Sequence, residues 1–290
     1  MELITKLYNI ANSTMEEPAS FGGFHLAFVA SVILLTVLMA SACRNCSDKT
    51  LRGVTGFVWI IIALLEVYKQ IIFGLSLSDG VFSWDYAWYA FPFQFCSSPL
   101  YILPIIAFAK NEKLRERCIA YMMTFSLFAG LAVFCYPNDV FIETVGINYQ
   151  TMIHHGSQIL MGVLYGVRYR AKLSPKFFFG GVRTFVAMVF IAMLLNVAGY
   201  HMLTLAGMGD TFNMFYISPY FACTLPILDT VWVKLPYLAF VCVYFFGFIL
   251  CALIVFSFFV GFTKSSRPYV ATRKGRKLAY ENDCIFYYNM

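Results

Sequence analysis

Charged residues are scarce in this chain of 290 residues: they make up 12% of the sequence, against about 25% in soluble globular proteins. Hydrophobic residues make up 60% of it, whereas about 45–50% is usual for a soluble domain. This shortage of charge excludes a soluble globular domain. It favours a polytopic membrane protein.

Other structural classes are excluded because the residues that define them are too few or too dispersed. The nine cysteines are spread over the whole chain, several of them inside apolar runs, which argues against a disulfide-stabilised secreted scaffold. Glycine (19) and proline (10) stay at ordinary levels, and 31 phenylalanines are present, so a collagen or a disordered tail is excluded. The net charge of +6 follows the sides of a membrane, as shown below, and we expect no nucleic-acid partner.

Seven apolar runs are long enough to cross a bilayer as helices, which takes about 20 residues for a hydrocarbon core of about 30 Å. The runs are 24–42, 54–75, 86–109, 118–136, 149–167, 184–206 and 235–262. The chain is therefore predicted to be all-α, a polytopic membrane protein with seven transmembrane helices in a membrane domain over 24–262. An N-terminal extracytoplasmic segment (1–23) and a basic cytoplasmic tail (263–290) flank this domain.

The basic residues predict the orientation. The first, third and fifth connections and the tail hold three, four, five and six Lys or Arg residues, whereas the opposite side holds only Lys6 and Lys234. By the positive-inside rule, the N-terminus lies outside and the C-terminus in the cytoplasm. Residues 1–23 lack an apolar core, so we expect no cleavable signal peptide. With seven spans, we expect a multi-pass protein of the cell membrane. Residues 273–277 are a candidate site for anionic headgroups, with a topology-setting basic flank as the alternative.

Several polar residues lie inside the predicted spans, where they are costly and call for a function or a partner. They are Glu66 and Lys69 in the second span, Gln94, Cys96 and Ser97 in the third, His154, His155 and Gln158 in the fifth, and Asn196 and His201 in the sixth. At a rise of about 1.5 Å per residue, the predicted directions place most of them between the midplane and the outer interface. Their common depth indicates a site.

Cys96 is the candidate nucleophile of this site. Pro92, Pro99 and Pro104 remove amide donors around it, which predicts a kinked helix that presents the thiol, or else a bend used only for packing. A histidine beside a thiol favours the thiolate and can carry the proton in acyl transfer, which is the role expected of His154 or His155.

No metal and no other cofactor is expected. Adjacent histidines are poor chelating partners, and no span is rich in carboxylates that might complete a ligand set. Glu66 and Lys69, three residues apart, are expected to neutralise each other, with orientation of the histidines as the alternative. Asn196 suits either an oxyanion donor or a hydrogen bond between helices.

A family resemblance rests on short motifs in a fixed order: residues 94–100, residues 134–137, the run His154-His155-Gly156, Asn196, and residues 213–219. In these the chain resembles the YwaF-like bacterial integral membrane family. It is more distantly similar to an animal transmembrane acyltransferase that builds ether phospholipids, and in architecture to the androgen-induced hydrolases of fatty-acid esters. The resemblance implies a compact seven-helix fold with Cys96 as nucleophile and His154 or His155, preferably His155, as its partner.

The leading functional hypothesis is a membrane-embedded lipid acyltransferase or lipid hydrolase of lipid metabolism, working through an acyl-thioester on membrane phospholipids. The alternative is a non-enzymatic transporter or a small-molecule or lipid-binding membrane protein that uses the same buried polar cluster. A retinal protein is disfavoured, because the last span (235–262) contains no lysine for a Schiff base.

Overall fold

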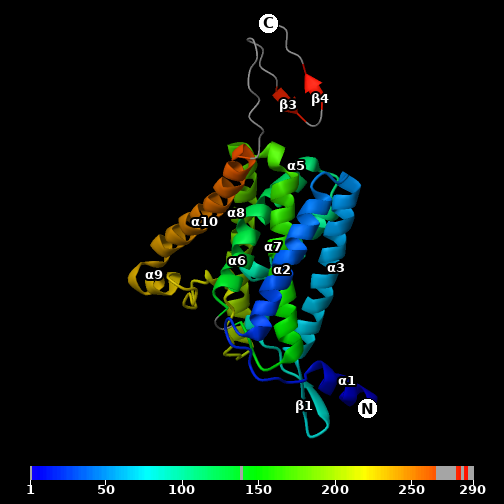
Figure 1. Cartoon of the computed structure of the whole chain (residues 1–290). Coiled ribbons are helices and arrows are strands. Elements are labelled where there is room, and N and C mark those ends of the chain that lie inside the picture. The colour runs from blue at the N-terminus through cyan, green and yellow to red at the C-terminus, as the bar shows by residue number, and fades with distance from the viewer. Residues whose placement is uncertain (1, 138–139, 266–278, 282–283, 287–290) are drawn as a thin grey trace.

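The computed structural model describes residues 2–137, 140–265, 279–281 and 284–286, and most of them form a bundle of long helices (Figure 1). The α-helices are α1 (Glu2–Ala11), α2 (Gly23–Cys43), α3 (Asp48–Ile72), α4 (Pro99–Phe108), α5 (Glu112–Tyr121), α6 (Leu127–Cys135), α7 (Val145–Arg168), α8 (Pro175–Leu205), α9 (Leu228–Lys234) and α10 (Tyr237–Ser265). Short helical turns are η1 (Trp88–Ala90), η2 (Phe95–Ser97), η4 (Arg170–Lys172) and η5 (Met214–Tyr216), and η3 (Met122–Ser126) is a π-helical turn that joins α5 to α6.

Five helices of the described chain are long and apolar enough to cross a membrane: α2, α3, the unit that runs from α5 through η3 to α6, α8 and α10. These helices support the prediction that the protein crosses the bilayer several times. α7 is 24 residues long but carries many of the buried polar side chains, and α4 has only 10 residues. The total of seven spans and their orientation therefore stay predictions.

The third predicted span, 86–109, is wrong as a continuous helix. Only α4 is α-helical there, and residues 86–98 form loops with the short turns η1 and η2. Proline explains the difference, because the residue before a proline avoids the helical region and proline itself fits the first turn of a helix. Phe91, before Pro92, has an extended backbone, and Pro99 begins α4. Cys96 lies in η2, ahead of the helix and not at a kink within it.

A β-hairpin follows α3 and was not predicted. Strand β1 (Leu75–Ser78) pairs antiparallel with β2 (Val81–Trp84), with Leu75 opposite Trp84. Asp79 and Gly80 both have positive φ, 52° and 77°, as the two-residue turn preferred in hairpins requires. The hairpin ends the second predicted span three residues early, at Ile72, and lies beside α1 at the far end of the bundle from the end of α10 (Figure 1).

Basic side chains hold the opposite end of the bundle together. Arg52 of α3 donates to the carbonyls of Ala107 and Ala109 at 3.2 and 3.0 Å, and the buried Arg115 of α5 donates to the carbonyl of Ile106 at 3.0 Å. These carbonyls end α4 and have no partner within their own helix, so the arginines satisfy them.

The chain beyond α10 is described only over two strands. Strand β3 (Ala279–Glu281) pairs antiparallel with β4 (Cys284–Phe286). The candidate headgroup site at residues 273–277 lies outside the described residues.

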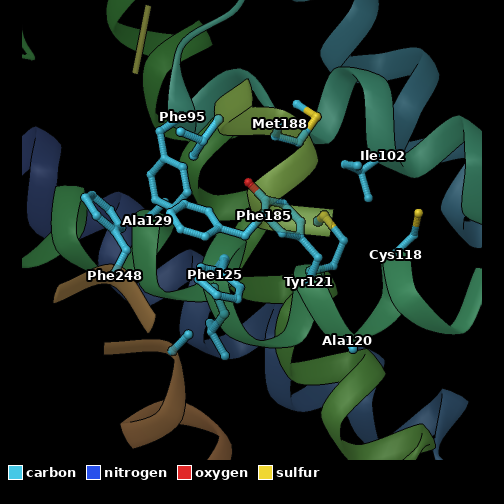
Figure 2. Packing of buried hydrophobic residues seen from close by; sticks show 14 of the residues in the cluster. Phe95, Ile102, Cys118, Ala120, Tyr121, Phe125, Ala129, Phe185, Met188 and Phe248 are labelled. Carbon is cyan, nitrogen blue, oxygen red and sulfur yellow. The ribbon is translucent and has the colours of Figure 1, made fainter. Parts of the chain in front are cut away.

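Phenylalanine and tyrosine make up 15 of the 39 buried residues of the main core cluster. Figure 2 shows the rings of Phe95, Phe125, Phe185 and Phe248 gathered between the helices. The ring centroids of Phe125 and Phe185 are 4.5 Å apart, and those of Phe95 and Phe248 are 4.8 Å apart. Because Phe95 belongs to η2, this cluster fixes the turn that carries Cys96 against α8 and α10.

Candidate functional site

Helix α7 supplies most of the polar site. Gln150, His154 and Gln158 are spaced four residues apart, so they share one face of the helix. All three are buried, with 5%, 3% and 0% of their surface exposed. His155 is buried as well. α7 packs against α2, α3 and α6, so this polar face lies inside the bundle.

The Cys96 turn is bound to α7 through its backbone. The carbonyl of Cys96 accepts a hydrogen bond from His154 Nε2 at 2.9 Å and a second one from the side-chain amide of Gln158. Cys96 as a whole residue is intermediate in exposure. The two α7 donors therefore hold the peptide of Cys96 and leave the thiol outside these hydrogen bonds.

The hydrogen bonds determine the tautomers of the two histidines when they are neutral, because a carbonyl accepts only. His154 donates from Nε2 to Cys96, so its Nδ1 carries the lone pair. His155 Nδ1 lies 2.8 Å from the carbonyl of Thr151, so its Nε2 carries the lone pair. Each ring thus keeps one basic nitrogen for chemistry.

Two acceptors in this face are buried without a partner in the described chain: His154 Nδ1 and Gln158 Oε1. A buried acceptor without a hydrogen bond costs about 1–3 kcal/mol. The two atoms therefore suit a donor that enters the site, such as a hydroxyl group or a water molecule.

Helix α3 contributes a charged network beside the histidines. Glu66 Oε1 accepts from Lys69 Nζ at 3.3 Å and from Gln70 Nε2 at 2.6 Å, and its other oxygen accepts from Gln150 Nε2 at 3.4 Å. The expected pairing of Glu66 with Lys69 is present in the structure. The bond from Gln150 joins the α3 network to the polar face of α7.

The helix α6 lies very close to the histidine helix at Gly130. A Cβ atom at this position would be 2.8 Å from the carbonyl oxygen of His155 and 2.9 Å from Cβ of Gln158. Only glycine permits this approach, since real Cβ contacts stay beyond 3.0 Å. Gly130 therefore sets the distance between α6 and the site.

Three of the predicted site residues have other contacts. Asn196 is fully buried and binds the backbone of Met214 twice, accepting from its N–H at 2.6 Å and donating to its carbonyl at 2.9 Å. Gln94 likewise accepts from the N–H of Phe215 at 3.1 Å and donates to the carbonyl of Asn213 at 3.2 Å. His201 is exposed and contacts Tyr220.

The loop that Gln94 and Asn196 hold is buried and strained. Phe215 and Tyr216 both adopt positive φ, 58° and 54°, although neither is glycine, a conformation that persists only where the surroundings impose it. The ring of Phe215 lies 5.7 Å from that of Phe93 and 5.5 Å from that of Phe95. Asn196 thus acts on the Cys96 turn through this loop, whereas Gln94 is the N-cap residue of that turn and binds the loop with its side chain.

The sequence prediction and the structure agree on which segments meet and differ in detail. Cys96 meets His154 and Gln158, and Glu66, paired with Lys69, reaches the same face of α7 at Gln150. Ser97 is buried next to Cys96. Gln150 was missed, although its spacing of four residues from His154 was the signal that could have found it. Within the described residues, no group of three or more His, Cys, Asp or Glu side chains is arranged to hold a metal ion, and the expectation of no metal stays a prediction.

Comparison with known proteins finds one family. The profile of the TMEM164 family, a transmembrane family, matches residues 20–260. No curated protein and no solved structure matches the chain. The matched region includes every residue of the site described in this subsection.

Proposed function

The chain belongs to the TMEM164 family, and from that premise we propose that it is a membrane-embedded lipid acyltransferase or lipid hydrolase that works through a thioester on Cys96. The observation that carries the proposal is the surrounding of this thiol. Cys96 is a partly exposed residue on the short 3₁₀ turn η2, and two side chains of the polar face of α7 bind its backbone carbonyl inside the bundle. The resemblance to YwaF-like proteins and to the animal acyltransferase is part of this proposal.

In the proposed first step, the lone-pair nitrogen of a histidine takes the proton of the Cys96 thiol. The sulfur attacks the carbonyl carbon of an acyl ester in a phospholipid, and the carbon–oxygen bond of the ester breaks. The departing alkoxide takes the proton back from the imidazolium. The products are an acyl-thioester on Cys96 and a lyso-lipid.

In the second step, the hydroxyl of an acceptor lyso-lipid, or water, gives its proton to the histidine and attacks the thioester. The carbon–sulfur bond breaks, and the thiol recovers the proton. We assign the base to His155, whose Nε2 carries the lone pair, and a positioning role to His154, whose Nε2–H is bound to the Cys96 carbonyl. The unpartnered Nδ1 of His154 and Oε1 of Gln158 are acceptors suited to another hydroxyl of the bound lipid or to a water molecule.

The test is intact-protein mass spectrometry of the purified protein after incubation with mixed phospholipids. We expect an added acyl mass that hydroxylamine removes and that is absent from Cys96→Ala. The matched control is Cys135→Ala, which removes an exposed cysteine of α6 and should keep the adduct. An adduct that persists in Cys96→Ala, or no adduct and no lipid turnover in the wild type, would contradict the mechanism.

A second function is favoured by the network of α3. Glu66, Lys69 and Gln150 place a charge pair and an amide inside the bundle, which also suits an ion or proton path in a transporter or a binding site for a small molecule. Glu66→Gln discriminates between the two. If the protein is a transporter, Glu66→Gln should lower the flux, and the wild type should form no thioester. If the protein is the proposed enzyme, the wild type should form a thioester that depends on Cys96.

For the topology we propose seven membrane-crossing segments in the cell membrane, with the N-terminus outside and the C-terminus in the cytoplasm. The five long apolar helices, the buried α7 and the loop-and-helix segment that ends in α4 supply the seven. The basic end described above faces the cytoplasm in this proposal.

A further inference from the structure

A cavity of about 290 Å³ lies between α5, η4 and the start of α8, at the basic end of the bundle. Five basic residues line it against a single acidic one: Lys113, Arg117, Lys172, Lys176 and Arg183, with Glu116. α5 and α8 lie close together here, as shown by the distance of 3.3 Å between Cγ of Arg117 and a Cβ atom placed at Gly180. The lining is therefore a concave surface with a formal charge of about +4.

Most of this charge is not neutralised by the protein. Glu116 pairs with Lys172, which also lies 5.4 Å from the ring centroid of Tyr169. Lys113, Arg117, Lys176 and Arg183 are exposed and form no ion pair in the described part of the chain. By contrast, Arg52 and Arg115 at the same end are both used in ion pairs.

The contrast indicates a ligand of negative charge. Arginine recognises phosphate with two parallel hydrogen bonds and lysine recognises it as a point charge, and this cavity presents both residue types around one space. α8 begins at Pro175 beside the cavity, so the positive end of its dipole adds to the attraction. Basic pockets between membrane helices bind phosphate-bearing headgroups in this way.

We propose that the cavity between α5 and α8 binds a phosphate group, carried either by an anionic lipid headgroup or by a soluble phosphate anion. The site is separate from that of Cys96, since neither Cys96 nor the two α7 residues bonded to it, His154 and Gln158, line the cavity. The outcome of a phosphate-binding test at this cavity is therefore independent of the thioester mechanism.

The test uses the full chain in nanodiscs of phosphatidylcholine that contain a minor fraction of phosphatidic acid, with native mass spectrometry to count retained lipid. The variant is Lys176→Gln with Arg183→Gln. The matched control is Lys49→Gln, an exposed basic residue at the same end that does not line the cavity. At about fivefold per removed cation, the double variant should bind phosphatidic acid about 30-fold more weakly, while Lys49→Gln should not differ from the wild type.

A second arm identifies the source of the phosphate. Competition by millimolar pyrophosphate would assign the site to a soluble anion, and retention of lipid despite pyrophosphate would assign it to a headgroup. The single variant Arg183→Lys keeps the charge of the cavity, so it should retain most of the wild-type binding. The proposal is overturned if the wild type binds neither ligand, or if Lys49→Gln weakens binding as much as the double variant does.

Discussion

His154 and His155 are neighbours in the chain whose side chains do different work. His154 donates to the carbonyl of Cys96, in another segment, whereas His155 bonds to Thr151 within its own helix. His154→Gln should therefore lower the free energy of unfolding by about 1–3 kcal/mol, and His155→Gln by less than about 1 kcal/mol. Thermal unfolding in detergent micelles measures both.

The same pair separates positioning from catalysis. His155→Gln should abolish thioester formation in a protein that remains folded. A stable, fully active His155→Gln would assign the base to His154 instead. Equal loss of stability in both variants would contradict the distinction drawn from their hydrogen bonds.

At Gly130 the site leaves no room for any side chain. Gly130→Ala would push a methyl group to within 3.0 Å of His155 and Gln158, so we expect a loss of about 1–3 kcal/mol from overpacking and lower activity. The control is Gly247→Ala in α10, where a Cβ atom meets nothing within 4 Å. That change should leave stability unchanged or raise it by up to about 1 kcal/mol through helix propensity. Unfolding midpoints that fall equally in both would refute this explanation.

At the scale of elements, the long apolar helices could be predicted and the segment around Cys96 could not. Hydropathy over about 20 residues identifies a helix that faces lipid, as for α2, α8 and α10. It does not distinguish such a helix from an apolar segment that is packed on protein, where irregular backbone is tolerated. Residues 86–98 are of this second kind, and their prolines, together with the Asp79-Gly80 turn before them, were the available signals.

The loop over residues 213–218 is the element that supports the Cys96 turn. Asn196→Leu would leave the N–H and the carbonyl of Met214 without partners, at a cost of about 2–5 kcal/mol. We expect the loop to loosen and Cys96 to react faster with iodoacetamide, as followed by peptide mass spectrometry. Thr204→Ala, near the end of the same helix, is the control and should leave the rate unchanged. An unchanged rate in Asn196→Leu, with helix content preserved, would show that the loop does not control the turn.

Over the whole molecule, the polar residues of the site could be found because they are rare in an apolar chain, but their roles could not. Glu66 and Lys69 lie beside α7 because α3 packs against it, and the Cys96 turn meets His154 and Gln158 through hydrogen bonds. Gln94 and Asn196 were grouped with them, yet their partners are backbone atoms of a loop that lies 18 or more residues away along the chain. Residue type predicts that a buried amide needs a partner, and only the fold determines which one.

The two ends of the bundle differ in charge, and this difference predicts the orientation in the membrane. The turn of the β1–β2 hairpin lies at one end, and Lys49, at the start of α3, lies at the other. Cells that express Asp79→Cys should be labelled at this position by an impermeant maleimide. Lys49→Cys should be labelled only after permeabilisation, with each site identified by peptide mass spectrometry against the wild type. The reverse pattern would show that the orientation is inverted. α3 has 25 residues and separates the two positions by most of the thickness of the bilayer. Labelling of both positions in intact cells would therefore contradict a crossing of the membrane by α3.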